Sequence, residues 1–149
     1  MPQVQVPQCL PIEDLPKNIL WLVKRAQAAR KKAYAPYSKF LVGCTLQDES
    51  KKIHTGCNVE NVSFSATVCA ERVAVGKMVS RGARKINNIV VVTSSDDPVF
   101  PCGVCLQVLQ EFGAGAKVFA VNRRATVFCE AKMAELFPQS FDKQHLPQS

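Results

Sequence analysis

Three cysteines and one glutamate have the types and the spacing of a metal site that activates water. Cys102 and Cys105 are three residues apart, so both sulfurs lie on one face of a helix that begins there. Cys69 offers a third thiolate, and Glu71 follows it by two residues. Structural zinc normally has four protein ligands, whereas catalytic zinc has three and an open position for water. Three thiolates beside a carboxylate therefore predict a catalytic zinc site.

This arrangement resembles the zinc-dependent deaminases of cytosine and adenine, in which a His or Cys, one residue and a Glu precede a later Pro-Cys-x-x-Cys. Over roughly residues 15–141 the chain resembles the cytidine deaminase family. The blocks that carry the resemblance, in the family's order, are Ala-Pro-Tyr-Ser-Lys-Phe at 35–40, Gly-Cys-Asn-Val-Glu-Asn at 56–61, Cys-Ala-Glu-Arg at 69–72, and Pro-Cys-Gly-Val-Cys at 101–105 with Gln107. The resemblance implies a three-layer α-β-α sandwich, one Zn²⁺ per chain and a homotetramer with shared active sites.

The resemblance also implies a role for each polar residue at the metal. Glu71 is expected to take a proton from the attacking water, deliver it to ring N3 of cytosine, and later protonate the departing amine. Three thiolates on one divalent ion leave a net negative charge, which helix-start N–H groups and Arg72 would offset. The plainer alternatives are a helix-start carboxylate for Glu71 and a surface ion pair for Arg72.

Asn58 and Glu60 are the candidate ribose contacts. They alternate with Val59 along an extended segment, so their side chains point to one face, where an amide and a carboxylate can bind a hydroxyl. A carboxylate there repels a 3′ phosphodiester, which favours free nucleosides over polynucleotides. Without the resemblance, both would be ordinary polar residues of a turn or an edge.

The resemblance assigns four further residues to the substrate. Phe40 would lie beside the nucleoside, although alone it would be taken for a core residue, and Ala70 would contact the base through its backbone. Phe64 and Phe141 would complete the pockets of neighbouring chains. Phe64 stands where many relatives carry Tyr, Leu106 where they carry Arg, and Leu41 where they carry Pro.

Composition indicates one domain with a substantial core, because the chain has 149 residues of which 47% are hydrophobic. No signal segment or membrane-spanning apolar run is apparent, so we expect a cytoplasmic protein with no membrane partner. The formal net charge of +7 comes from scattered basic residues without an aromatic platform, so we expect no nucleic-acid partner. With three cysteines assigned to zinc, the remaining four, Cys9, Cys44, Cys57 and Cys129, are expected to be ordinary thiols.

Hydrophobic periodicity predicts an α/β fold. Residues 1–12 are interpreted as a flexible arm and residues 13–149 as one catalytic domain. The expected elements are a helix to about residue 33, a hairpin of 40–46 with 53–59, a helix over 68–79, a strand at 89–93, a helix over 103–112, strands at 118–121 and 127–129, and a closing helix at 131–136. These strands make a mixed five-stranded sheet with a βαβ unit, and both cysteine blocks fall at helix starts.

The predicted reaction is zinc-dependent hydrolysis of cytidine and deoxycytidine to uridine and deoxyuridine, as in pyrimidine salvage. A blasticidin-type or a polynucleotide cytosine deaminase is the alternative within the same chemistry. A non-enzymatic zinc module would need a fourth ligand, and His54, His145 and Cys57 lack obvious ligand spacing. A dithiol redox motif would leave Cys69 and Glu71 unexplained.

Overall fold

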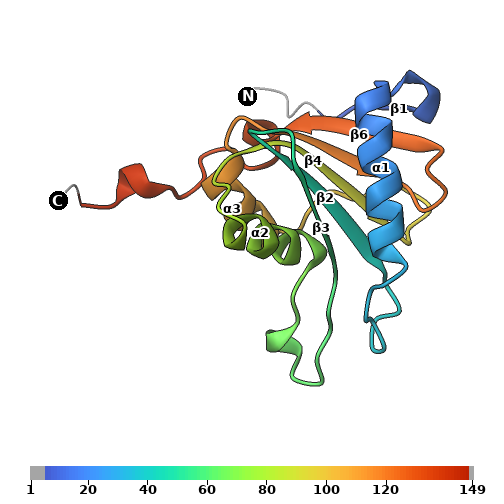
Figure 1. Cartoon of the computed structure of the whole chain (residues 1–149), viewed down its shortest axis with the longest axis horizontal. Helices are drawn as coiled ribbons and strands as arrows, with labels where there is room; N and C mark the ends of the chain where they lie inside the picture. Colours follow the sequence, from blue (N-terminus) through green and yellow to red (C-terminus); the bar gives the residue numbers. More distant parts are fainter. Residues whose placement is uncertain (1–5, 148–149) are drawn as a thin grey trace.

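A mixed β-sheet with helices on both faces forms the molecule (Figure 1). The computed structural model describes residues 6–147. Its elements in chain order are β1 (Cys9–Pro11), a 3-10 turn (Ile12–Asp14), α1 (Lys17–Arg30), β2 (Val42–Asp48), β3 (Ile53–Cys57), a 3-10 turn (Phe64–Ala66), α2 (Ala70–Ser80), β4 (Ile86–Thr93), α3 (Gly103–Gly113), β5 (Lys117–Val121), β6 (Val127–Lys132), α4 (Met133–Leu136) and a 3-10 turn (Lys143–His145). No helix in this described part is long and apolar enough to cross a membrane.

The strands lie in the order β1-β6-β5-β4-β2-β3, with β4 and β5 parallel and every other neighbouring pair antiparallel. The β2–β3 hairpin and the β4–α3–β5 unit confirm the predicted topology. The predicted count of five strands was wrong, because β1 adds a sixth strand against β6. β1 has three residues and ends in Pro11, so it is too short to show an alternating pattern.

Residues 1–12 were predicted to be a flexible arm, but the second half of this segment is held by hydrogen bonds. Cys9–Pro11 is paired with β6, and the N–H of Ile12 donates to the carbonyl of Thr126 at 2.9 Å. Residues 1–5 lie outside the described part of the chain.

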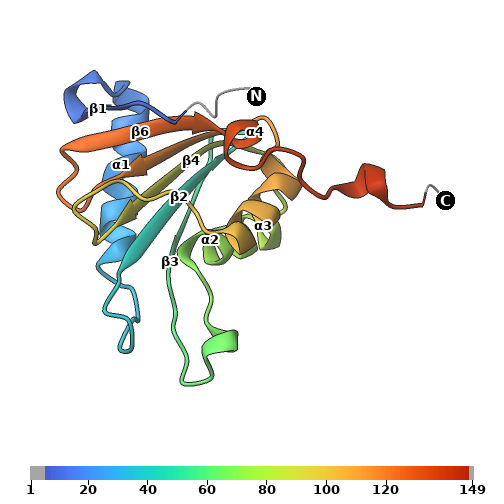
Figure 2. The same ribbon diagram turned by 180° about the vertical axis from the view of Figure 1, so that it is seen from behind.

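The two faces of the sheet carry separate cores. α1 packs on one face, where Leu22, Val23 and Ala26 meet Val90 and Val92 of β4. α2 and α3 pack on the other face, where Ala74, Met78 and Leu109 meet Ile89 and Val91 (Figure 2). Alternate residues of β4 therefore serve opposite faces, and all the predicted helices fall in the two outer layers. The three-layer sandwich is confirmed.

Cys9 and Cys129 form a disulfide, so the expectation that both were ordinary thiols was wrong. They are directly opposed in the β1–β6 ladder but are 120 residues apart in sequence, and nothing local signals their pairing.

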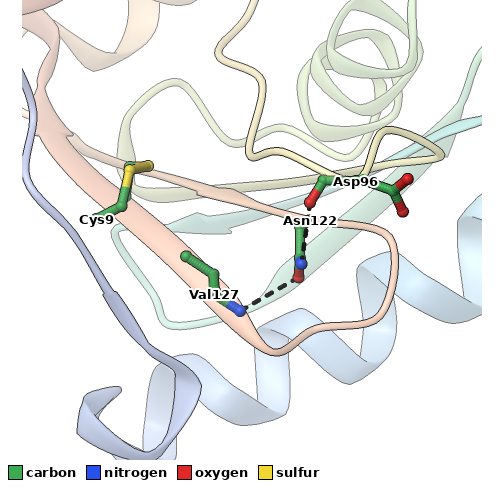
Figure 3. Close-up of a disulfide and its surroundings, with 5 residues drawn as sticks. Cys9, Asp96, Asn122 and Val127 are labelled. Carbon is green, nitrogen blue, oxygen red and sulfur yellow. Dashed lines mark hydrogen bonds between the residues drawn. A yellow bond between two sulfur atoms is a disulfide. The ribbon is translucent and has the colours of Figure 1, made fainter.

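Figure 3 shows Cys9 on the sheet near the β5–β6 turn, which Asn122 stabilises. The Asn122 side chain donates to the carbonyl of Asp96 at 3.2 Å and accepts from the N–H of Val127 at 3.2 Å.

Replacing Cys9 by Ser should lower the free energy of unfolding. The disulfide closes a loop across 120 residues, and losing such a cross-link typically costs about 2–5 kcal/mol because the unfolded chain regains entropy. The matched control is Cys57→Ser, which removes a free thiol. Guanidinium unfolding followed by circular dichroism measures both variants. Equal stability of Cys9→Ser and the wild type would show that the disulfide contributes nothing.

Candidate active site

The three predicted metal-binding cysteines converge at the N-termini of two neighbouring helices. Cys69 is the N-cap of α2, Cys102 is the N-cap of α3, and Cys105 lies in the first turn of α3. Their sulfurs all lie within 4.8 Å of one another, and no further His, Cys, Asp or Glu joins the group within residues 6–147. Tetrahedral zinc with Zn–S bonds of ~2.3 Å separates its sulfurs by roughly 3.8 Å. The cluster therefore fits zinc with three protein ligands.

The electrostatics of the cluster favour a thiolate at Cys69. A hydrogen bond with Cys105 is the largest cause that lowers the pKa of Cys69 to about 5, and Arg72 and Cys102 add to it while burial opposes it. The pKa of Cys105 is raised, chiefly by the same contact and by burial. The two sulfurs thus share a proton that a cation would displace. Softness, charge and spacing all suit Zn²⁺.

Arg72 lies beside the cysteines, where the sequence placed it. Its Nη2 donates to the carbonyl of Thr67 at 2.9 Å, which fixes the guanidinium, and the guanidinium helps to lower the pKa of Cys69. The Nε atom is buried and has no protein partner among the described residues. The side chain is therefore held at the thiolates rather than in a surface ion pair.

Glu71 lies against the same cluster. Its side chain is buried, and its Oε2 is 3.6 Å from Sγ of Cys105. Burial raises the pKa of Glu71, and the negative charge of Cys69 raises it further. A carboxyl with a raised pKa can accept a proton and return it near neutral pH, which suits general acid–base chemistry.

A cavity of about 280 Å³ opens from Glu71 toward solvent. Seven predicted site residues line it, namely Phe40, Asn58, Glu60, Cys69, Ala70, Glu71 and Cys102. Residues that were not predicted from the sequence also line it, namely Ser38, Val42, Thr67, Val91, Thr93, Val99 and Phe100. Ser38 belongs to a recognised block and could have been found, whereas the others carry no local signal. Apolar walls with a few polar groups are typical of a small-molecule site.

Asn58 and Glu60 both line this cavity, as their alternation predicted, whereas Val59 between them is 43% exposed. The Asn58 side chain donates to the carbonyl of Phe40 at 2.8 Å and accepts from the N–H of Val42 at 2.9 Å. These bonds fasten the loop of residues 34–42 to the end of β3. One Nδ2 proton of Asn58 remains for a ligand.

Glu60 fastens the same loop at a second point. Its Oε1 accepts from the N–H groups of Tyr37 at 2.9 Å and Ser38 at 3.1 Å. A hydrogen bond from the Ser38 side chain is the largest cause that holds the pKa of Glu60 below its ordinary value. The group is therefore anionic at neutral pH, and a carboxylate has the capacity to accept from a ligand hydroxyl as well.

Phe64 and Phe141 do not reach the cavity of their own chain. Phe64 is 74% exposed and meets Tyr37 edge to face, with ring centroids 5.7 Å apart. Phe141 is 58% exposed and stacks on His145, with ring centroids 5.6 Å apart. In Figures 1 and 2 the segment after α4 runs away from the body of the molecule. A single chain therefore leaves both rings uncovered.

A larger cavity of about 440 Å³ lies at the turn between β2 and β3. It shares no residue with the cavity at Glu71 and contains no thiol. Its buried Asp48 carboxylate already bonds to His54 at 2.8 Å and to the N–H groups of Ser50 and Lys52. The convergent reactive groups lie in the smaller cavity.

Known proteins share both the motifs and the fold. The family model described as the cytidine and deoxycytidylate deaminase zinc-binding region matches residues 16–121. A cytidine deaminase of Sporosarcina psychrophila is 43% identical over 126 residues, covering 84% of this chain and 92% of its own. One from Halalkalibacterium halodurans is 40% identical over 126 residues, covering 84% and 95%.

Solved structures agree. The crystal structure of cytidine deaminase from Burkholderia pseudomallei matches with a TM-score of 0.78 and 39% identity, covering 82% of this chain and 98% of that one. The enzyme from Mycobacterium tuberculosis matches with a TM-score of 0.73 and 31% identity, covering 85% and 99%. Sequence, fold and the geometry of the thiolate cluster lead to one conclusion: the chain belongs to the cytidine and deoxycytidylate deaminase family.

Proposed function

We propose that this protein hydrolyses free cytidine and deoxycytidine to uridine and deoxyuridine with release of ammonia, using one Zn²⁺ held by Cys69, Cys102 and Cys105. The observation that carries this proposal is the buried Glu71 carboxyl, which lies beside the three-sulfur cluster and lines the adjoining cavity. A purely structural zinc module needs no carboxyl there and would close the site with a fourth ligand.

When bound, zinc acts as a Lewis acid that makes water a competent nucleophile at neutral pH. Glu71 takes a proton from the attacking water and delivers it to ring N3 as the oxygen adds at C4. It then transfers the second water proton to the exocyclic amine, and ammonia leaves as the C4 carbonyl forms. One water is consumed and one ammonia is released, so the protons balance with Glu71 returned to its starting state.

The remaining pocket residues orient the nucleoside. The Ala70 backbone and the ring of Phe40 bound the base, while Asn58 and Glu60 offer an N–H and a carboxylate oxygen to the ribose. Because Glu60 is anionic, a 3′ phosphate would meet like charge at short range. This favours free nucleosides over the polynucleotide alternative, and a blasticidin-type substrate would not need a ribose contact here.

The active form that we propose is a homotetramer. The exposed rings of Phe64 and Phe141 and the projecting segment after α4 are costly in a lone chain, and neighbouring pockets would cover them. We further propose pyrimidine salvage in the cytoplasm as the setting of this activity, which cell fractionation with an activity assay would test.

Replacing Glu71 by Gln should abolish most turnover while zinc content stays the same. Losing general acid–base catalysis typically costs about a hundredfold to ten-thousandfold in rate, and several proton transfers here depend on one group. The matched control is Glu111→Gln, an exposed acid on α3. The measurements are cytidine absorbance kinetics and zinc by mass spectrometry. Activity within tenfold of the wild type would remove Glu71 from this role.

Replacing Glu60 by Gln should change which cytidine derivatives are accepted. Gln retains an acceptor for the Tyr37 and Ser38 N–H groups, so the loop should stay in place while the negative charge is lost. We expect kcat/KM to fall for cytidine and the discrimination against cytidine 3′-phosphate to weaken. The ratio of the two efficiencies is the measured quantity. An unchanged ratio, or wild-type activity on single-stranded DNA equal to that on cytidine, would contradict the ribose assignment.

Replacing Phe141 by Ala should raise KM or weaken assembly. Burying a Phe ring contributes about 1.5–3 kcal/mol, and the ring is uncovered within its own chain. Leu146→Ala, which removes another exposed apolar side chain from the same segment, is the control. Light scattering and steady-state kinetics test both variants. A fully active monomer would rule out shared pockets.

A further inference from the structure

A third concave surface lies at the open edge of the sheet, between α1 and α2. This β3-edge cavity has a volume of about 160 Å³. It is lined by Arg25, Ala28, Ala29 and Lys32 from α1 and its C-terminal side, Thr55, Gly56 and Cys57 of β3, and Lys77 of α2. It shares no residue with the nucleoside cavity.

All the charged side chains that line the β3-edge cavity are cations, namely Arg25, Lys32 and Lys77. Among the ion pairs of residues 6–147, none involves any of the three. Lys77 lies in the last turn of α2, and Lys32 follows the end of α1. Each helix C-terminus carries only about half a negative charge. Three full positive charges exceed that, so the cavity has an unneutralised positive field.

Free backbone donors lie at the same edge. β3 is the last strand of the sheet. Two hydrogen bonds beyond its ends, from the Asn58 N–H to the Val42 carbonyl and from the Asp48 N–H to the Lys52 carbonyl, show which residues of β3 bond to β2. Because antiparallel pairs alternate, residues 54 and 56 bond to β2, whereas Thr55 and Cys57 direct their N–H and C=O groups outward. The cavity thus combines cations with unpaired amides.

Lysines on an edge strand can prevent pairing with strands of other molecules, but that role does not explain the three cations at this cavity. Protective lysines lie on the edge strand itself, and β3 carries neither lysine nor arginine. Arg25 comes instead from α1, Lys32 from just beyond its end and Lys77 from α2, and all three line the cavity beside the strand. Phosphate oxygens accept hydrogen bonds from cationic side chains and from free backbone N–H groups.

We infer that the β3-edge cavity is a binding site for a small anion that carries phosphate. This site is separate from the proposed deaminase activity and does not depend on it. Cys57 is a free thiol, is not fully buried, and lines the cavity, so it can report occupancy directly.

The test follows alkylation of Cys57 by iodoacetamide in the zinc-loaded protein, with peptide mass spectrometry as the readout. Inorganic phosphate is the probe, and sodium chloride at equal ionic strength is the control for screening. Iodoacetamide is neutral, so protection reports occupancy rather than repulsion of the reagent. We expect phosphate, but not chloride, to slow the reaction severalfold at millimolar concentrations. No protection by phosphate would overturn the inference.

Paired variants separate a built site from diffuse charge. Lys32→Gln/Lys77→Gln removes two cations from the cavity, and the matched Lys31→Gln/Lys85→Gln removes two exposed cations outside it. Because charge-assisted bonds are the strong ones, we expect the first pair to raise the half-protecting phosphate concentration about tenfold. The second pair should leave it within about twofold, since only long-range charge changes. The same measurement is repeated with a single-stranded oligonucleotide as probe. If the two pairs of substitutions change the half-protecting concentration of either probe equally, the surface is diffusely basic and the inference of a phosphate site is overturned.

Discussion

The close approach of α2 to β3 at Gly56 is the contact on which the active site depends. A Cβ atom at this position would lie 2.3 Å from the Ala70 carbonyl oxygen and 2.6 Å from the Ala74 nitrogen, so only glycine allows the helix to rest there. That contact sets where α2 begins, and with it the positions of Cys69 and Glu71. The β4–α3–β5 crossover brings the start of α3 to the same face of the sheet. The N-termini of α2 and α3 therefore lie side by side, and this brings the three zinc-binding cysteines together.

A second set of contacts builds the nucleoside pocket around this metal centre. The loop of residues 34–42 has no regular structure of its own before β2 begins at Val42, yet seven hydrogen bonds to Asn58 and Glu60 hold it. Lys39 adopts a φ of 60° within it, a conformation that a lysine keeps only where its surroundings fix it. The residues expected to hold ribose are therefore also the residues that shape the cavity wall. Substitutions that remove their hydrogen-bonding atoms, such as Asn58→Ala or Glu60→Ala, will affect both binding and pocket shape, whereas Glu60→Gln keeps the acceptor oxygen that holds the loop.

The sequence predicted most of the fold, because helical periodicity, β-branched runs and helix-start cysteines are local signals. It also predicted which residues meet at the metal, because the motif spacing carries that information. It did not reveal β1 or the disulfide of Cys9 with Cys129, since both depend on pairing between residues 120 apart. The apolar wall at Val99 and Phe100 was missed because these residues carry no local signal of their own. The double use of Asn58 and Glu60 was missed because it depends on a loop with no periodic pattern.

The chemistry of this protein depends on Cys69, Cys102 and Cys105 binding one zinc ion and leaving a position open for water. X-ray absorption spectroscopy of the purified zinc-loaded protein tests it most directly, because it counts sulfur neighbours without relying on activity. We expect one zinc per chain with three sulfur neighbours at ~2.3 Å and a lighter oxygen or nitrogen neighbour. Four sulfur neighbours would indicate a closed structural site, and protein that folds and deaminates cytidine with no bound metal would rule out zinc catalysis altogether.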